Sequence, residues 1–204
     1  MEALLAFGAA LLALRLSGLL AARWRASRLP HLAAWSAGLA AYALGAGALA
    51  WGAAAGWDDR AFRAYYLFGA LLTAPLLGAG SLLSVGWRLA TPVVLVYVGL
   101  AVGVMLAEPL TAPVSGTTIP AAQEHLDYVP ARILALVGNG AGSFALVGVA
   151  LLSLRRRPLG NALLLAGFSL AAAGSALSGL GAAETGAFIA VAALLLYGGT
   201  IARA

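Results

Sequence analysis

Polar side chains recur at helical spacing within the apolar runs of this chain. In the run over residues 131–154, Arg132, Asn139 and Ser143 are separated by seven and four residues, so at about 100° per residue they project from nearly one helix face. Hydrocarbon cannot satisfy such groups, so we expect this face to point into a helix bundle. Two kinds of chemistry fit it: ordinary hydrogen bonding between helices, or the wall of a cavity that binds a ligand.

The candidate site combines the polar residues at or inside one end of the apolar runs. Two further runs carry such residues there, one with Tyr66 and one with Tyr97 and Glu108. All seven acids fall at or beyond the same ends of the runs, so charge-paired binding is expected at that side. An arginine buried without a carboxylate is costly, so Arg132 should contact Glu108, Glu184 or a bound anion. The predicted ligand-binding residues are Tyr66, Glu108, Arg132, Asn139 and Glu184.

The sequence carries no pattern typical of catalysis or metal binding. It has no cysteine, which excludes disulfides, thiolate nucleophiles and iron–sulfur clusters, and no lysine that could hold retinal as a Schiff base. His31 and His125 fall on opposite sides and cannot share a metal site. His125 lies beside Glu124 and Asp127, where a surface cation is the alternative to the solvated loop that we expect. The stretch WDDR, residues 57–60, is typical of a helix cap in a turn. We therefore predict no catalytic residue, no metal site and no cofactor.

Arg15 is a cation in the middle of the first apolar run. It lies seven residues, or roughly 10 Å, from the inner end of that run at Ala22. An extended arginine can reach across much of that depth, so contact with lipid phosphate at the membrane surface explains it. The alternative is a buried Arg15 that binds backbone carbonyls or an anionic ligand, because no carboxylate lies in that half of the bundle.

Composition and run length predict an all-α membrane protein. Of the 204 residues, 63% are hydrophobic and 9% are charged, which is too apolar for a soluble globular domain. A helix needs about 20 apolar residues to cross a bilayer, and the chain contains seven continuous runs of this kind, rich in alanine and leucine. The predicted single domain, residues 1–204, has seven transmembrane helices near residues 3–22, 31–55, 62–85, 90–109, 131–154, 160–181 and 185–202.

The charges between the runs predict the orientation. Eight arginines fall on one side and three on the other: Arg23, Arg25, Arg28, Arg88, Arg155, Arg156, Arg157 and Arg203 against Arg60, Arg63 and Arg132. The positive-inside rule makes the first side cytoplasmic, with the N-terminus outside and the C-terminus inside. The first run precedes its arginines, so it is expected to be a retained helix and not a signal peptide. This distribution also explains the net charge of +5 without a nucleic-acid partner.

Two of the runs share a glycine pattern. Both carry glycines every seven residues: Gly38, Gly45 and Gly52 in the second run, Gly167, Gly174 and Gly181 in the sixth. Each trio would form a seam along which neighbouring backbones approach closely. A true repeat would make spans 1–3 and 5–7 two parallel three-helix repeats joined by helix 4, the plan of some small transporters. Chance similarity between two runs rich in alanine and glycine would look the same.

The longest connection, residues 110–130, joins the fourth and fifth runs on the outer side. A segment of that length is typical of a cap or lid, although a polar spacer between two distant helices would have the same composition. Because it begins just after Glu108 and ends just before Arg132, we expect it to fold over the candidate site.

The chain contains the stretches FRAYYLFGALLTAPLLGAGSLL, PARILALVGNGAGSFALVGVALLS and NALLLAGFSLAAAGSALSGLGAAETGAF. These resemble an uncharacterised family of small seven-helix integral membrane proteins of high-GC bacteria. The resemblance extends from the second helix onward and implies an architecture in the bacterial inner membrane, without an activity. Residues typical of that family are Arg63, Tyr66, Arg132, Asn161 and a carboxylate near Glu184. Where the family carries an asparagine and further acids before the seventh span, this chain has LSGLGAAETG, and this departure weakens the case for an ion site there.

The sequence predicts a non-enzymatic, multi-pass cell-membrane protein that binds, transports or senses a small or lipophilic molecule through an outward-facing cavity. Its expected partners are membrane lipids and that ligand. One alternative is an accessory subunit that packs its glycine and alanine seams against another membrane protein or a second copy of itself. The other is a lipid-modifying membrane enzyme, for which Glu108, Glu184 and His31 are the acids or bases near enough to the membrane surface.

Overall fold

The described part of the chain is helical. The computed structural model describes residues 2–153 and, beyond them, stretches of one to three residues between 159 and 195. No strand occurs within that part. Its elements are α1 (Glu2–Ser27), α2 (Pro30–Ala55), α3 (Asp59–Tyr65), η1 (Tyr66–Leu72), α4 (Thr73–Ser84), α5 (Ala90–Ala107), α6 (Ala122–His125), η2 (Tyr128–Arg132) and α7 (Ile133–Leu152).

Five stretches of the described residues are long and apolar enough to cross a membrane. They are Ala3–Ser27, Pro30–Ala55, Asp59–Ser84, Ala90–Ala107 and Tyr128–Leu152, and they correspond to the first five predicted spans. The prediction of an all-α protein with several candidate membrane-spanning helices is therefore confirmed. The predicted spans 160–181 and 185–202 lie outside the described residues apart from a few positions. The count of seven, the orientation and the repeat stay predictions.

Local capping chemistry starts the second and third spans. α2 begins with Pro30, which tolerates the first helical position because its missing N–H has no partner there anyway. α3 begins after Asp58, whose Oδ1 accepts a hydrogen bond from Ala61 N at 2.7 Å. The prediction that WDDR forms a helix cap is therefore confirmed.

The third span contains a π-helical stretch before its proline. A proline inside a helix has no N–H to donate, and its ring displaces the carbonyl four residues earlier, so Pro75 predicts an irregularity. The structure places the irregularity in η1, between α3 and α4. The Thr73 hydroxyl donates to Phe68 O, five residues back, at 2.8 Å. The wide turn therefore lies between Tyr66 and the proline, within the outer half of the predicted bundle.

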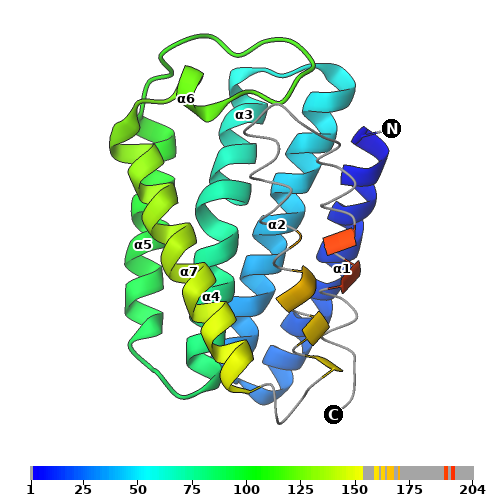
Figure 1. The fold of residues 1–204 in the computed structure, drawn as a ribbon, viewed down its shortest axis with the longest axis vertical. Coiled ribbons are helices and arrows are strands. Elements are labelled where there is room, and N and C mark those ends of the chain that lie inside the picture. The colour runs from blue at the N-terminus through cyan, green and yellow to red at the C-terminus, as the bar shows by residue number, and fades with distance from the viewer. Residues whose placement is uncertain are drawn as a thin grey trace.

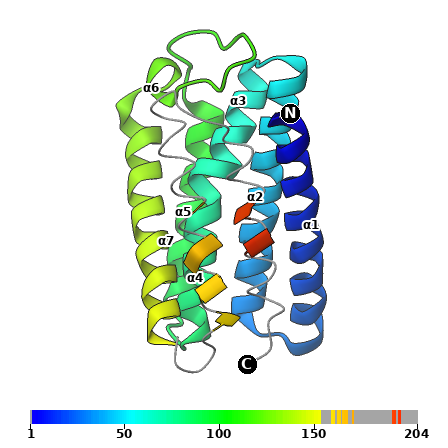
Figure 2. The same ribbon diagram turned by 45° about the vertical axis from the view of Figure 1, so that its right-hand side comes forward.

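The helices form one bundle in which spans consecutive in the sequence run in opposite directions (Figures 1 and 2). α1 packs on α2, α2 packs on the third span, and α4 packs on α7, while α5 stands beside α4 on the side away from α1 (Figure 1). Ser17 on α1 and Ser36 on α2 each donate a hydroxyl hydrogen bond to the other's backbone carbonyl, at 2.8 and 2.9 Å. Such polar pairs hold apolar helices together where lipid offers no competing partner.

The glycine seam predicted for the second span is present. Gly38, Gly45 and Gly52 are all buried on α2. A Cβ added to Gly45 would lie 2.9 Å from the Cα and N atoms of Gly69, and one added to Gly38 would meet Leu77. The small residues therefore let α2 approach the third span closely.

A second close crossing joins α4 to α7. A Cβ on Gly78 would lie 2.6 Å from Gly142 Cα, and a Cβ on Gly142 would lie 2.7 Å from Pro75 N besides meeting the Ala74 carbonyl. All of these neighbours are backbone atoms, which cannot move aside by changing rotamer. The packing of α4 on α7 therefore depends on glycine at both positions.

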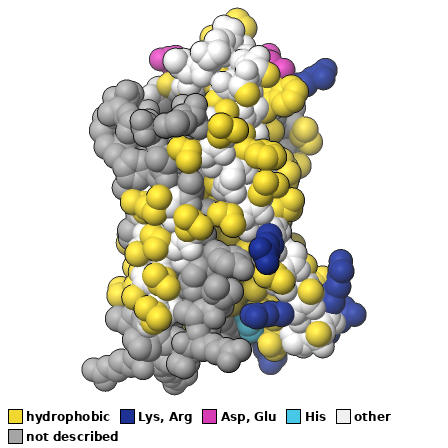
Figure 3. All heavy atoms as spheres, turned by 90° about the vertical axis from the view of Figure 1, so that its right-hand side faces the viewer, with side chains coloured by type: hydrophobic (Ala, Val, Ile, Leu, Met, Phe, Trp, Pro, Cys, Tyr) yellow, Lys and Arg dark blue, Asp and Glu magenta, His cyan; other side chains and the backbone are white. Residues whose placement is uncertain are grey.

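The outward faces of the spans are apolar, as expected next to lipid. Exposed large side chains include Leu100 and Leu106 on α5 and Phe144 on α7. On the face seen in Figure 3, most arginine side chains lie toward one end of the bundle and the acidic side chains lie at the other. Arg15 is exposed on α1, which is the position required of a side chain that extends along the helix surface toward lipid phosphate.

Candidate functional site

The connection between α5 and α7 lies across one end of the bundle (top of Figure 1). Val114 and Leu126 of this connection are buried. Val114 N donates to Asp59 Oδ1 at 3.0 Å, and Trp57 N donates to Gly116 O at 2.7 Å. The connection is thus tied to the turn between α2 and α3, and it packs as a cap over this end.

Glu108 is the residue that ends α5 and begins this connection. Its backbone is extended, and its N–H donates to Val104 O at 2.8 Å. The side chain is only 7% exposed, yet neither carboxyl oxygen has a hydrogen-bond partner among the residues that the structure describes. A buried carboxyl without a partner costs free energy, so Glu108 is the group in this site that would gain most from a bound ligand.

Arg63 on α3 binds the backbone at the end of α5 and not the Glu108 carboxyl group. Its guanidinium donates to Met105 O at 2.5 Å and to Glu108 O at 2.7 Å. Carbonyls at a helix C-terminus lack intrahelical donors, and a cation at that end also complements the helix dipole. Arg63 therefore fixes the end of α5 and, with it, the position of Glu108.

Burial raises the pKa of the Glu108 carboxyl above its ordinary value, and the Asp127 carboxylate nearby raises it further. The N–H groups of Ala131 and Asp127 and the Arg63 guanidinium act in the opposite direction. The two N–H groups are near enough to favour the charged form, although neither forms a hydrogen bond of good geometry with the carboxyl oxygens. Because burial is the largest effect, Glu108 keeps its proton to higher pH than an exposed glutamate does.

Arg132 forms no ion pair with Glu108 within the described structure. Its guanidinium lies over the Tyr128 ring, with Cζ 5.3 Å from the ring centroid, which is a cation–π geometry. Tyr66, buried on η1, lies within electrostatic range of both Arg132 and Glu108. Three of the five predicted site residues are thus neighbours, but the direct contact expected between Arg132 and Glu108 is not formed.

The other two predicted residues are not placed in this cluster. Asn139 lies about two turns farther along α7 than Arg132 and is half-buried. The buried residues of α7 include Ala135, Gly138 and Gly142. The helix face that carries Asn139 therefore lies next to the buried face and does not coincide with it. Glu184 lies outside the described residues.

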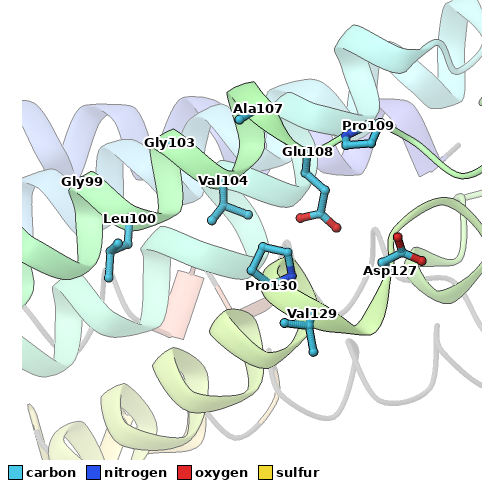
Figure 4. Close-up of a pocket in the computed structure, with 10 residues that line it drawn as sticks. All are labelled: Gly99, Leu100, Gly103, Val104, Ala107, Glu108, Pro109, Asp127, Val129 and Pro130. Carbon is cyan, nitrogen blue, oxygen red and sulfur yellow. The ribbon is translucent and has the colours of Figure 1, made fainter.

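An open groove of about 500 Å³ lies beside Glu108, between α5 and the start of α7 (Figure 4). A Cβ on Gly99 or Gly103 would meet nothing within 4 Å, so the absence of side chains at these positions helps to leave the space open. Farther along α5, the Tyr97 hydroxyl donates to Leu134 O at 3.1 Å and joins α5 to α7. The residues that line the groove are Gly99, Leu100, Gly103, Val104, Ala107, Glu108, Pro109, Asp127, Val129 and Pro130.

The groove is apolar along its length and acidic at one end. In Figure 4 the carboxyl groups of Glu108 and Asp127 lie at the same end, and Leu100 lies farther along α5. No arginine or histidine is among the described lining residues. The groove therefore fits a ligand that has an apolar chain and a polar end.

The sequence pattern does not identify Asp127, Gly99 or Gly103 as site residues. Asp127 reaches the groove because the connection folds back over the bundle, and a connection of mixed composition carries no signal for that path. The glycines do carry a signal, because two small residues four positions apart leave a notch on one face of a helix. Gly99 and Gly103 precede Glu108 in the sequence by nine and five residues, respectively.

His125 takes part in folding the connection. Its ring packs edge-on against Phe62, with ring centroids 5.4 Å apart, and its Nδ1 lies 3.1 Å from Ala112 O. Across the described residues, no group of three or more histidine or acidic side chains could hold a metal ion.

Comparison of the chain with protein-family models, curated proteins and solved structures gives no match.

Proposed function

We propose that this protein binds a lipophilic molecule in the groove between α5 and the start of α7, and that it does not convert that molecule chemically. The observation that carries the proposal is the Glu108 carboxyl group. It is 7% exposed, it has no hydrogen-bond partner among the described residues, and it stands at the end of an apolar groove. A ligand that supplies a partner there removes the cost of the unsatisfied carboxyl group. Binding is the step that transport and sensing share.

The groove offers a lateral route of entry from the membrane. Gly99, Leu100 and Gly103 are exposed on α5, a span whose other exposed side chains include Val96 and Leu106. A molecule dissolved in the hydrocarbon can therefore reach the groove without crossing water. The apolar lining stabilises an alkyl chain through contacts of the same kind as those between lipid tails and Leu or Val side chains.

The proposal places the groove toward the outer leaflet. Glu108 and the capping connection lie at one end of the bundle, and Arg23, Arg25 and Arg28 lie at the other, where α1 ends. The positive-inside rule assigns the arginine-rich end to the cytoplasm. A tag at Met1 should then be accessible from outside and a tag at Ala204 only from inside, and accessibility from one side for both would contradict the seven-span orientation.

Photolabelling tests the binding proposal. The protein in lipid nanodiscs is irradiated with an uncharged alkyl diazirine, and the labelled residues are mapped by mass spectrometry. Labelling should concentrate on groove residues such as Leu100 and Val129, above the level at an exposed lipid-facing residue outside the groove, such as Leu14.

Two glycine variants provide the matched controls for that experiment. Gly103→Leu places a side chain in the groove and should abolish the excess labelling. Gly18→Leu adds the same side chain at an exposed position on α1 where a Cβ also meets nothing within 4 Å, and should leave the labelling unchanged. Labelling that simply follows exposure to lipid, with no effect of Gly103→Leu, would reject the proposal. A stoichiometric protein partner covering α5 would favour the accessory-subunit alternative instead.

A further inference from the structure

We propose that the groove selects an amphiphile whose polar end is a cationic amine, bound between the carboxyl groups of Glu108 and Asp127. This inference rests on the proposed function and adds the chemistry of the ligand's polar end. It starts from a buried carboxyl group that faces the groove without a partner. It also depends on the absence of any positive lining residue in the described part of the groove.

Within the described residues, two arginines lie near the acidic end, and both contact other groups. Arg63 donates two hydrogen bonds, to Met105 O and to Glu108 O. Arg132 lies over the Tyr128 ring. Neither guanidinium donates a hydrogen bond to a Glu108 carboxyl oxygen, so a ligand can still supply that bond.

An amine fits this end better than the other polar groups that amphiphiles carry. An ammonium group has three N–H donors and no acceptor, so it can donate to Glu108 and Asp127 together. A hydroxyl group donates one hydrogen bond and leaves the second carboxyl group without a partner. A phosphate or carboxylate headgroup would be repelled by the two acids. The matching ligand is therefore a lipophilic amine without a phosphate group.

Among the described residues, charged and titratable groups reach Glu108 from three parts of the chain. Arg63 approaches from α3, Tyr66 from η1, and Asp127 from the connection after α5. An ammonium group favours the ionised form of Glu108, so binding of the amine and protonation of Glu108 exclude each other. Amine binding should accordingly weaken as the pH falls through the raised pKa of this carboxyl group.

The test compares two probes with the same chain. Dodecylamine carries the cation, and N-dodecylacetamide replaces it with a neutral amide. Binding of each probe to the full-length protein in nanodiscs is measured by native mass spectrometry, at a pH where Glu108 is ionised. The wild type should prefer dodecylamine by roughly ten- to a hundredfold, as expected for a charge-assisted hydrogen bond. Glu108→Gln should reduce that preference to near unity.

Further variants separate the possible outcomes. Asp127→Asn, at an exposed position, should lower the preference without disturbing the fold, and so tests the inference even if Glu108→Gln folds poorly. Equal binding of both probes to the wild type, with both lost in Gly103→Leu, would overturn the amine inference and leave the binding proposal intact. Binding of both probes unaffected by Gly103→Leu, relative to Gly18→Leu, would overturn both.

Discussion

Replacing Gly142 by alanine should destabilise the bundle, whereas the same change at Gly140 should not. A Cβ on Gly142 would meet the Ala74 carbonyl of α4 and lie 2.7 Å from Pro75 N. Gly140 lies two residues away on the same helix, and a Cβ there meets nothing within 4 Å. The two substitutions are chemically identical, so their difference measures the crossing of α4 on α7.

The magnitude follows from two opposing effects. Alanine is favoured over glycine in a helix by about 1 kcal/mol, and this gain applies at both positions. Heavy atoms in contact prefer separations of about 3.5–4 Å, so at Gly142 the two backbones must move apart by about 1 Å. Overpacking of this kind costs about 1–3 kcal/mol. The free energy of unfolding of Gly142→Ala should therefore lie about 1–3 kcal/mol below that of Gly140→Ala, because the helix propensity cancels.

Steric trapping in bicelles measures the free energy of unfolding of both variants and of the wild type under the same conditions. Gly140→Ala should be equal to the wild type or more stable, and Gly142→Ala should be the least stable of the three. Gly78→Ala should behave like Gly142→Ala, since its Cβ would lie 2.6 Å from Gly142 Cα. Equal stabilities of Gly142→Ala and Gly140→Ala would refute the close crossing.

Three further predictions concern the candidate site. Arg63→Gln should lower the free energy of unfolding by about 1.5–3 kcal/mol, since it removes charge-assisted hydrogen bonds to the end of α5; Arg60→Gln, at an exposed position, is the control in the same unfolding assay. Because burial raises the pKa of Glu108, the folded state holds this proton more tightly than the unfolded state. The stabilisation it contributes should be complete below the ordinary pKa of about 4.3 and be lost as the pH rises through the raised value. In Glu108→Gln the free energy of unfolding should lack this pH-dependent part. The same pH dependence in the variant and the wild type would contradict the burial of the Glu108 carboxyl group. Tyr97→Phe removes the hydrogen bond to Leu134 O and should cost about 0.5–1.5 kcal/mol; no loss in the same assay would mean that this bond does not help to hold α5 against α7.

The sequence by itself determined the features that depend on neighbouring residues. The first five spans follow from runs of apolar residues, because a helix of about 20 such residues satisfies its own backbone in hydrocarbon. The cap at Asp58 follows from the preference of aspartate for the position before a helix. The seam formed by Gly38, Gly45 and Gly52 follows from their seven-residue spacing, which keeps them on one face. Each of these signals lies within a short stretch of neighbouring residues.

Only the tertiary structure decided which polar groups meet. The sequence marks Arg132 as a partner of Glu108, but Arg132 lies over Tyr128, and Arg63 instead reaches the end of α5, at carbonyls 42 and 45 residues away. The groove likewise depends on Asp127, which the connection brings back to the end of α5. Such contacts are set by the rotation of each helix about its axis and by the path of the connection. A one-residue change in rotation turns a side chain by about 100°, so residue spacing within one helix cannot determine them.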